Sequence, residues 1–208
     1  HLPLIMGKND DGSVSKLSKR HGSTSFNGLV EEGYLPETIV NYIALLGWCP
    51  KENREIFSLA ELCEAFSIDG ISKAPAVFDY DKLTWFNGEY LRMKSPETFT
   101  EMAMPYYREV FGEAEKDWAV LTSILQPRVT KLNEIPGMIG FLKELPDYPV
   151  DIFVNKKSKA NLENAGPMLQ AAIDTLTALP EWNVTLLHDS LMDLAKKLEV
   201  KNGTLLWP

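Results

Sequence analysis

Most of the motifs from which enzymes build a self-contained active site are missing from this sequence. It contains no HExxH, GxGxxG or Walker lysine loop, and its three histidines stand far apart. Its two cysteines, Cys49 and Cys63, belong to no CxxC pair, and we interpret them as free thiols in a reducing compartment. The pattern gives little support to acid–base catalysis by this chain alone, and it predicts no metal site.

Long apolar runs are also missing. No stretch approaches the roughly 20 apolar residues that span a bilayer, and no signal peptide is visible. We therefore expect a soluble, cytoplasmic protein that contacts no membrane. The composition, with 45% hydrophobic and 24% charged residues, is typical of a folded globular chain.

An overall excess of positive charge is absent too. The net charge of −8 argues against indiscriminate binding of nucleic acid by the whole surface. Phosphate contacts depend instead on local cationic patches. Three are present, although each alone is also typical of a solvated surface: Lys16 with Lys19 and Arg20, Lys156 with Lys157 and Lys159, and Arg128 with Lys131 at helical spacing.

Both ends of the chain are apolar. Residues 2–6 read as a strand with nothing before it, and residues 205–208 end the chain in Leu-Leu-Trp-Pro. A single strand does not stabilise itself. We therefore expect this chain to be a piece of a longer protein.

Turn formers at residues 7–13 predict a tight hairpin that leads into the basic segment 16–20. Beyond it the pattern is helical, and no alternating strand pattern follows residue 80. We expect a short helix to Glu32 capped by Ser23, Thr24 or Ser25, then helices over 36–47, 59–66, 80–93 and 96–112. Four more are expected over 116–131 with a kink or break at Pro127, 138–144, 156–179 with an interruption at Gly166–Pro167, and 184–201.

Apolar and aromatic stripes mark the faces that we expect to be buried. The helix over 36–47 carries one, and the helix over 80–93 carries so much aromatic area that burial is favoured. Aromatic residues further along could stack on bases, but their helical spacing favours core packing for most of them. The residues concerned are Ile39, Val40, Ile43, Ala44 and Leu46; Leu83, Trp85, Phe86, Tyr90 and Leu91; and Tyr106, Tyr107, Trp118 and Trp182.

The basic segment Lys16-Leu17-Ser18-Lys19-Arg20 is the strongest chemical signal. Three cations in five positions, on a turn after a strand, suit a polyphosphate whose charge shifts during a reaction. Lysine acts there as a point charge on a flexible stem. Taken alone, such a pentapeptide is more often a solvated turn.

Its context makes the signal specific. The ordered series across residues 1–93 closely resembles bacterial glutamyl-tRNA synthetases, and the remainder is similar with lower specificity through QPR at 126–128, PEW at 180–182 and WP at 207–208. The segments that carry the close resemblance are KLSKRHGSTS at 16–25, GYLPE at 33–37, NYIALLGW at 41–48, REIFSL at 54–59, SKAPAVFD at 72–79, KL at 82–83 and WFNG at 85–88.

The resemblance implies a mainly α fold in four parts. Residues 1–22 would be the end of a Rossmann catalytic domain, a strand and hairpin remnant with the KLSKR loop. Residues 23–94 would be an α-helical stem-contact fold. Residues 95–147 and 148–208 would be two helical anticodon-binding subdomains, the second one truncated.

The resemblance also implies site residues. Lys16, Leu17, Ser18, Lys19 and Arg20 match the ATP-contacting KMSKS signature of class I synthetases, with Leu17 in place of Met and Arg20 in place of Ser. The second lysine of that signature, here Lys19, contacts the phosphates during adenylate formation. Lys19 is thus the first catalytic candidate and Lys16 the second.

Arg128 and Lys131 are the candidates for contacting tRNA. Arg128 matches the arginine that reads the third anticodon base in this family, and a guanidinium fork suits the edge of an unstacked base. An enzyme that discriminates for glutamate is therefore favoured. The alternative is a helix-surface arginine that pairs with a carboxylate such as Glu134.

The implied parent reaction activates L-glutamate with ATP and Mg²⁺ and transfers it to tRNA-Glu. We expect a monomer, and we expect this piece alone to be inactive. Two alternatives stay open: a non-catalytic RNA-binding or scaffold module, and part of a glutaminyl-tRNA synthetase, which would carry β-barrels after the equivalent loop.

Overall fold

The computed structural model describes residues 4–9, 11–52 and 54–208, and of Lys19 the backbone alone. Its chain forms two compact units, His1–Leu145 and Pro146–Pro208. The division lies beside Pro146 and Pro149, where the sequence has its clearest punctuation in the helical region. The finer division into four parts stays a prediction.

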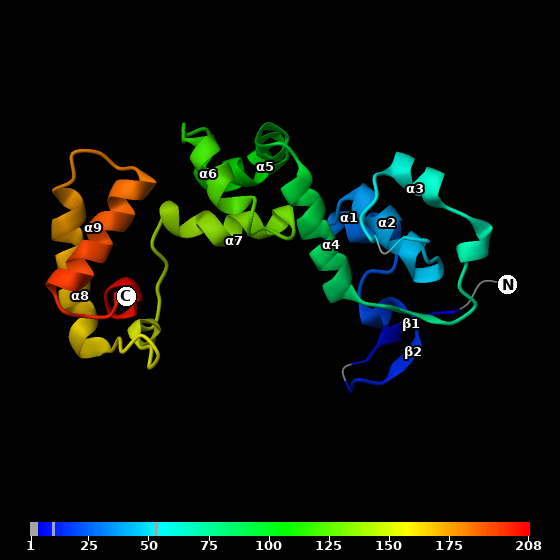
Figure 1. Cartoon of the computed structure of the whole chain (residues 1–208), viewed down its shortest axis with the longest axis horizontal. Coiled ribbons are helices and arrows are strands. Elements are labelled where there is room, and N and C mark those ends of the chain that lie inside the picture. The colour runs from blue at the N-terminus through cyan, green and yellow to red at the C-terminus, as the bar shows by residue number, and fades with distance from the viewer. Residues whose placement is uncertain (1–3, 10, 53) are drawn as a thin grey trace. The chain divides into compact units, whose positions relative to one another are not determined.

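A small sheet opens the first unit (Figure 1). Strands β1 (Ile5–Lys8) and β2 (Val14–Lys16) form the expected antiparallel hairpin, in which Met6 pairs with Lys16. Gly12 supports the turn with a φ of 80°. The first residues of the expected strand, 2 and 3, lie outside the described residues.

A third strand, β3 (Ala76–Phe78), was not predicted from the sequence. It lies parallel to β1, with Met6 opposite Val77, and gives the strand order β2-β1-β3. Three residues are too short to show a strand period, and the parallel partner is some 70 residues away in the chain. Only the tertiary pairing makes this segment a strand.

Helices make up the rest of the first unit, and the expected caps are in place. Ser25 and Asp79 accept hydrogen bonds at the starts of α1 and α4, Ser58 forms the complete capping box of α3 with Glu61, and Ser95 caps α5. The α-helices are α1 Phe26–Glu31, α2 Pro36–Gly47, α3 Leu59–Ala65, α4 Tyr80–Met93, α5 Pro96–Phe111, α6 Trp118–Leu125 and α7 Ile135–Ile139. The 3₁₀ turns are η1 Lys19–His21, η2 Ile68–Gly70, η3 Leu132–Glu134 and η4 Gly140–Leu142.

The buried face of α2 differs from the expected stripe. Val40 and Ile43 are exposed, whereas Thr38, Asn41 and Tyr42 are buried with Ile39. Asn41 is buried because its side chain bonds the backbone N–H of Phe57 (2.7 Å), the hydroxyl of Tyr90 (2.7 Å) and the carbonyl of Glu55 (2.8 Å). Ile39, Ala44 and Leu46 of the expected stripe do pack on a core, whereas the expectation is wrong for Val40 and Ile43.

The aromatic stripe of α4 is buried for the most part. Leu83, Phe86, Tyr90 and Leu91 belong to the main core of the unit, but Trp85 is 47% exposed and is a correction to the expectation. Further along, Tyr107 is fully buried and stacks on Trp118 with 5.6 Å between ring centroids. Tyr107 lies in the core and Trp118 packs against it, as their helical spacing predicted.

Two helices end or begin elsewhere than expected. The helix predicted over 116–131 is α6, which starts at Trp118 and ends at Leu125, just before Pro127, where a kink or break was expected. Arg128 and Lys131 follow this break and do not lie at helical spacing on one helix. The helix predicted over 138–144 is α7, which begins at Ile135 and gives way to η4 at Gly140. Pro136 near the start of α7 fits the first turn of a helix, where no backbone N–H is needed.

The second unit contains η5 (Val150–Phe153), α8 (Leu162–Thr177), α9 (Val184–Lys197) and α10 (Asn202–Leu206). α8 runs unbroken through Gly166–Pro167, so the expected interruption is wrong: Pro167 removes a single backbone donor and the helix continues. α8 begins only at Leu162 because Asn161 caps it through the backbone N–H groups of Glu163 and Asn164.

The last expected helix, 184–201, ends early. α9 stops at Lys197, Glu199 adopts a φ of 55°, and the unpredicted α10 follows. Leu194 and Ala195 of α9 pack with Leu205 of α10 in the core of this unit. That apolar contact requires the chain to turn back after Lys197. In the described part of the chain, no helix is long and apolar enough to cross a membrane.

Candidate functional site

The KLSKR segment leaves the sheet directly at the end of β2. Lys16 is the last residue of the strand, and η1 begins at Lys19. Between them, the backbone N–H of Leu17 donates to the carbonyl of Ile5 at 3.0 Å, and the Leu17 side chain packs on the main core. Leu17 therefore anchors the segment, while Lys16 and Arg20 are exposed to solvent.

The first catalytic candidate, Lys19, is described by its backbone alone, so the reach of its side chain lies outside the described residues. The structure brings Lys16, Leu17, Ser18 and Arg20 onto one short turn with it. Their roles toward ATP stay predictions.

His21 and Asn9 join this turn to the hairpin, and sequence reasoning missed both. The backbone N–H of Ser18 donates to Nδ1 of His21 at 3.0 Å, and Nε2 of His21 lies 3.0 Å from Oδ1 of Asn9. Arg20 takes part through Ser15, because its Nη2 donates to the Ser15 hydroxyl at 2.6 Å. The only signal in the sequence is a histidine directly after the basic run, and it does not identify a partner.

An open depression of about 610 Å³ borders the turn and is lined by Lys8, Asn9, Asp11, Arg20 and His21. Lys8 pairs with Asp79 at 2.9 Å, and the hydrogen bond from Lys8 lowers the pKa of that carboxyl. Hydrogen bonds from the side chain and backbone of Ser13 lower the pKa of Asp11. The depression thus carries both signs of charge, with Arg20 as its cation on the KLSKR side.

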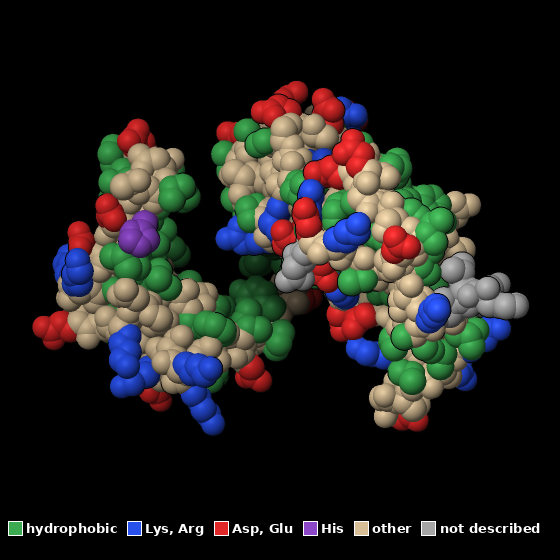
Figure 2. Space-filling model, turned by 45° about the vertical axis from the view of Figure 1, so that its right-hand side comes forward, with side chains coloured by type: hydrophobic (Ala, Val, Ile, Leu, Met, Phe, Trp, Pro, Cys, Tyr) green, Lys and Arg blue, Asp and Glu red, His purple; other side chains and the backbone are tan. Residues whose placement is uncertain are grey.

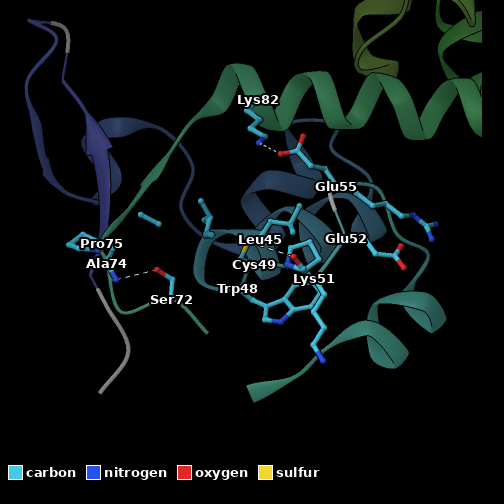
Figure 3. A pocket seen from close by; sticks show the side chains of 14 residues that line it. Leu45, Trp48, Cys49, Lys51, Glu52, Glu55, Ser72, Ala74, Pro75 and Lys82 are labelled. Carbon is cyan, nitrogen blue, oxygen red and sulfur yellow. Dashed lines mark hydrogen bonds and ion pairs between the residues drawn. The ribbon is translucent and has the colours of Figure 1, made fainter. Parts of the chain in front are cut away.

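A second hollow, of about 520 Å³, lies beside the end of α2 and the start of α4 (Figure 3). Lys82 points toward Glu55 across it, with 2.5 Å between Nζ and Oε1, and Arg54 of its rim pairs with Glu61 at 2.6 Å. Two of its cations are therefore neutralised by neighbours. Cys49, a free and exposed thiol like Cys63, also lines it.

Arg128 is exposed on the turn after α6. Its Nη1 donates to the carbonyl of Ile124 at 2.6 Å, which uses one of five guanidinium N–H donors. The Glu134 carboxylate, named as an alternative partner of Arg128, accepts instead from the Thr130 hydroxyl at 2.8 Å and from the backbone N–H of Lys131 at 3.2 Å. The guanidinium is held by backbone and faces solvent.

Lys131 is half-buried, and its ammonium lies 5.3 Å from the centre of the Tyr34 ring. Part of its role is therefore within the fold, as a cation over an aromatic face. Arg128 and Lys131 remain close in sequence, but the turn gives each a different environment.

The third basic patch belongs to the second unit. Lys156, Lys157 and Lys159 are exposed on a turn that the Asn155–Ala160 bridge closes, and the hydroxyl of Thr204 ties this turn to α10 through the Ser158 carbonyl at 2.6 Å. Trp182 of this unit is 69% exposed and is not a core residue. On the face that Figure 2 shows, Lys and Arg side chains stand in small groups among Asp and Glu, in keeping with the negative net charge.

The described residues contain no group of three or more His, Cys, Asp or Glu side chains that could hold a metal ion. The candidate residues are thus cations and hydrogen-bond donors, which suit phosphate and base edges.

Known protein families match both parts of the chain. The catalytic domain of class I tRNA synthetases (E and Q) matches residues 3–85, and the anticodon binding domain matches residues 98–208. The second match covers more than half of the chain, which therefore belongs to the anticodon binding domain family, and the first part is similar to the catalytic domain of class I tRNA synthetases.

Comparison with individual proteins narrows the similarity to glutamate–tRNA ligases. Over its whole length the chain is 48% identical to glutamate–tRNA ligase of Clostridium tetani and 44% identical to that of Clostridium kluyveri, and it covers 42% of each. The crystal structure of a glutamate tRNA ligase from Elizabethkingia meningosepticum in complex with its amino acid matches with a TM-score of 0.75 and 27% identity, over all of this chain and 44% of that one. These relatives are glutamate–tRNA ligases, and the chain spans less than half of their length.

Proposed function

We propose that this chain is the tRNA-binding part of a glutamate–tRNA ligase and also supplies the phosphate-contacting turn of its active site. The complete protein would activate L-glutamate with ATP and Mg²⁺, release pyrophosphate, and transfer the glutamyl group to tRNA-Glu. The single observation that carries the proposal is the 48% identity over all 208 residues, which include both the KLSKR turn and the anticodon binding domain.

The KLSKR turn would steady the phosphates. Lys19 first and Lys16 second are the proposed catalytic residues, with Leu17, Ser18 and Arg20 completing the ATP-contacting segment. Lys16 and Arg20 are both exposed, and Arg20 lines the depression beside β1 and β2, which supports this assignment. Cations placed on a turn can approach the leaving pyrophosphate as it gains charge.

The RNA contacts would come from Arg128 and, secondarily, Lys131. Arg128 supports the proposal because it is exposed and its guanidinium is oriented by the Ile124 carbonyl. An oriented fork loses less entropy when it binds the edge of a base. We further infer a cytoplasmic monomer for the complete protein.

The rival of a glutaminyl-tRNA synthetase has less support. The relatives named above are glutamate–tRNA ligases, and residues 79–208, all of them described, contain helices and turns where that rival would have β-barrels. A non-catalytic RNA-binding module is the rival that an experiment must separate.

Titration of the 208-residue chain with tRNA-Glu, tRNA-Gln and a tRNA with an unrelated anticodon, at several salt concentrations, tests the proposal. We expect tRNA-Glu to bind best, with an affinity that falls as salt rises because phosphate contacts release counterions. Equal binding of all three tRNAs would favour the non-catalytic module. Absence of binding at low salt would contradict the tRNA-binding role.

A further inference from the structure

We propose that His21 is a positioning residue that fixes the KLSKR turn on the β1–β2 hairpin in a single arrangement. Its Nδ1 would accept from the Ser18 N–H, and its Nε2 would donate to Asn9. The inference rests on the proposed function, because it concerns the arrangement in which this turn meets phosphate. It does not make His21 a group that touches the reacting atoms.

The hydrogen bonds indicate which role each ring nitrogen plays. A backbone N–H can only donate, so the Ser18 N–H at 3.0 Å requires a lone pair on Nδ1. Oδ1 of Asn9, at 3.0 Å from Nε2, is an acceptor and requires a proton there. The amide of Asn9 is oriented by its own Nδ2, which donates to the Ser13 hydroxyl at 2.8 Å. The Ser18 carbonyl also lies 3.2 Å from Nδ1, but the contact with the Ser18 N–H is shorter, so we assign Nδ1 as the acceptor and Nε2 as the donor.

The position of the ring is fixed by packing as well. A methyl group at Gly7 would lie 2.7 Å from Cγ of His21, so the ring rests directly on the backbone of β1. Real Cβ atoms do not approach carbon so closely, and a larger residue at position 7 would have to displace the ring. His21 thus fills the space that the missing side chain of Gly7 leaves.

The same network reaches the cation of the turn. Oδ1 of Asn9 accepts from the Ser15 hydroxyl at 3.1 Å as well as from His21, and Ser15 in turn accepts from Arg20 at 2.6 Å. Loss of His21 would free the Ser18 amide and remove one of the two donors that hold Asn9. The loosened turn would have to be ordered each time phosphate binds, which weakens binding.

Three substitutions of His21 test the hydrogen bonds of its two ring nitrogens separately. His21→Asn places an amide oxygen where Nδ1 stands, so it can still accept from the Ser18 N–H, but it is too short to reach Asn9. His21→Gln places its terminal amide near the position of Nε2 and can donate to Asn9. His21→Ala does neither. His188→Ala is the matched control, because His188 is exposed and its ring pairs with its neighbour Asp189.

The readouts are made on the 208-residue chain by NMR. We expect the ¹⁵N resonance of His21 Nδ1 to show an unprotonated nitrogen and that of Nε2 a protonated one at pH 7.5. We expect the Ser18 amide to exchange about tenfold faster in His21→Ala, the change that loss of one hydrogen bond produces. His21→Asn should restore most of the protection, His21→Gln little of it, and His188→Ala should leave it unchanged.

Gly7→Ala tests the packing of the His21 ring on β1, because the added methyl group would displace the ring. We expect it to shift the His21 ring resonances and to speed exchange at Ser18, with the far-UV circular dichroism unchanged. The inference is overturned if His21 is protonated on Nδ1, or if His21→Ala leaves the exchange of the Ser18 amide as it was. The His21 variants decide the question even where Gly7→Ala unfolds the hairpin.

Titration of the unsubstituted chain with Mg-ATP keeps the two proposals distinguishable. We expect the Ser18 and Arg20 amides to shift on binding, and His21→Ala to weaken that binding about tenfold while His21→Asn weakens it less. No shift in the unsubstituted chain would count against the ATP-contacting role alone. Equal Mg-ATP binding by His21→Ala and the unsubstituted chain would overturn the positioning role.

Discussion

The side chain of Tyr42 makes hydrogen bonds with both backbone polar groups of Asp79. Its hydroxyl donates to the Asp79 carbonyl at 2.9 Å and accepts from the Asp79 N–H at 2.7 Å. Asp79 is also the N-cap of α4 and the partner of Lys8 on β1. One buried phenol on α2 therefore fixes the residue at which the sheet passes into the long helix α4.

Tyr42→Phe should destabilise the first unit by about 1–3 kcal/mol at neutral pH, because it leaves the N–H and the carbonyl of Asp79 without their partner. Burial raises the pKa of Tyr42 from its ordinary 10.0 to about 12. The unfolded chain then ionises first, so the contribution of Tyr42 is complete below pH 10 and is lost as the pH rises from 10 toward 12.

Urea unfolding of the two proteins at pH 7.5, 10 and 11.5 measures this loss. The difference in the free energy of unfolding between unsubstituted chain and Tyr42→Phe should shrink as the pH rises. Tyr148→Phe, at an exposed ring, is the control and should show no such trend. A constant difference across this range would contradict the role of burial.

Ionisation of Glu61 makes the free energy of unfolding depend on pH in the acid range. Its hydrogen bond with the Arg54 side chain first, and those with Ser58 next, lower its pKa from 4.5 to about 2. The folded state therefore stabilises the ionised form of Glu61 relative to the unfolded state. Its contribution is present above pH 4.5 and is lost as the pH falls toward 2.

Comparison of Glu61→Gln with the unsubstituted chain tests this by urea unfolding at pH 6, 4 and 2.5. We expect Glu61→Gln to be the less stable protein at pH 6, with a difference that narrows steadily toward pH 2.5. Glu64→Gln changes an exposed carboxylate in the same helix and serves as the control. A difference that grows on acidification would refute the expected direction.

Asn87 is a fully buried polar residue that joins three segments. Its Oδ1 accepts from the Leu35 N–H at 2.8 Å, and its Nδ2 donates to the carbonyls of Gly33 at 3.2 Å and Thr130 at 2.6 Å. Asn87→Ala should cost about 2–4 kcal/mol, because it orphans buried backbone groups and leaves a small cavity. Thermal and urea unfolding measure it, with exposed Asn202→Ala as the control; equal stability of the two variants would show that water replaces the amide.

Arg128→Ala tests the proposed anticodon contact. If the guanidinium reads a base, the affinity for tRNA-Glu should fall about tenfold to a hundredfold and the preference over an unrelated tRNA should narrow. The slope of affinity against salt should stay nearly unchanged, whereas loss of a phosphate contact would reduce it by about one. Arg108→Ala, an exposed arginine of α5, is the control. Unaltered affinity in Arg128→Ala would remove Arg128 from the interface.

Interactions between residues close in the sequence determined the helix starts and the first hairpin of this protein. The caps at Ser25, Ser58, Asp79 and Ser95 define helix starts because each side chain bonds amides only two or three residues ahead. Turn formers alone were enough to predict the β1–β2 hairpin, and an ordered series of short motifs was enough to indicate the family. Such signals depend on neighbours in the chain, so they can be read without a structure.

Tertiary structure alone decided the features that depend on distant partners. β3 is a strand because β1 lies beside it, Asn41 is buried because Phe57 and Tyr90 use its amide, and α9 stops at Lys197 because Leu205 folds back onto Leu194. His21 shows the same limit at the site: its partners Ser18 and Asn9 are near in sequence, but the hairpin decides which ring nitrogen meets which of them. Hydrogen bonding and packing satisfy groups in space, and the sequence records their spacing only along the chain.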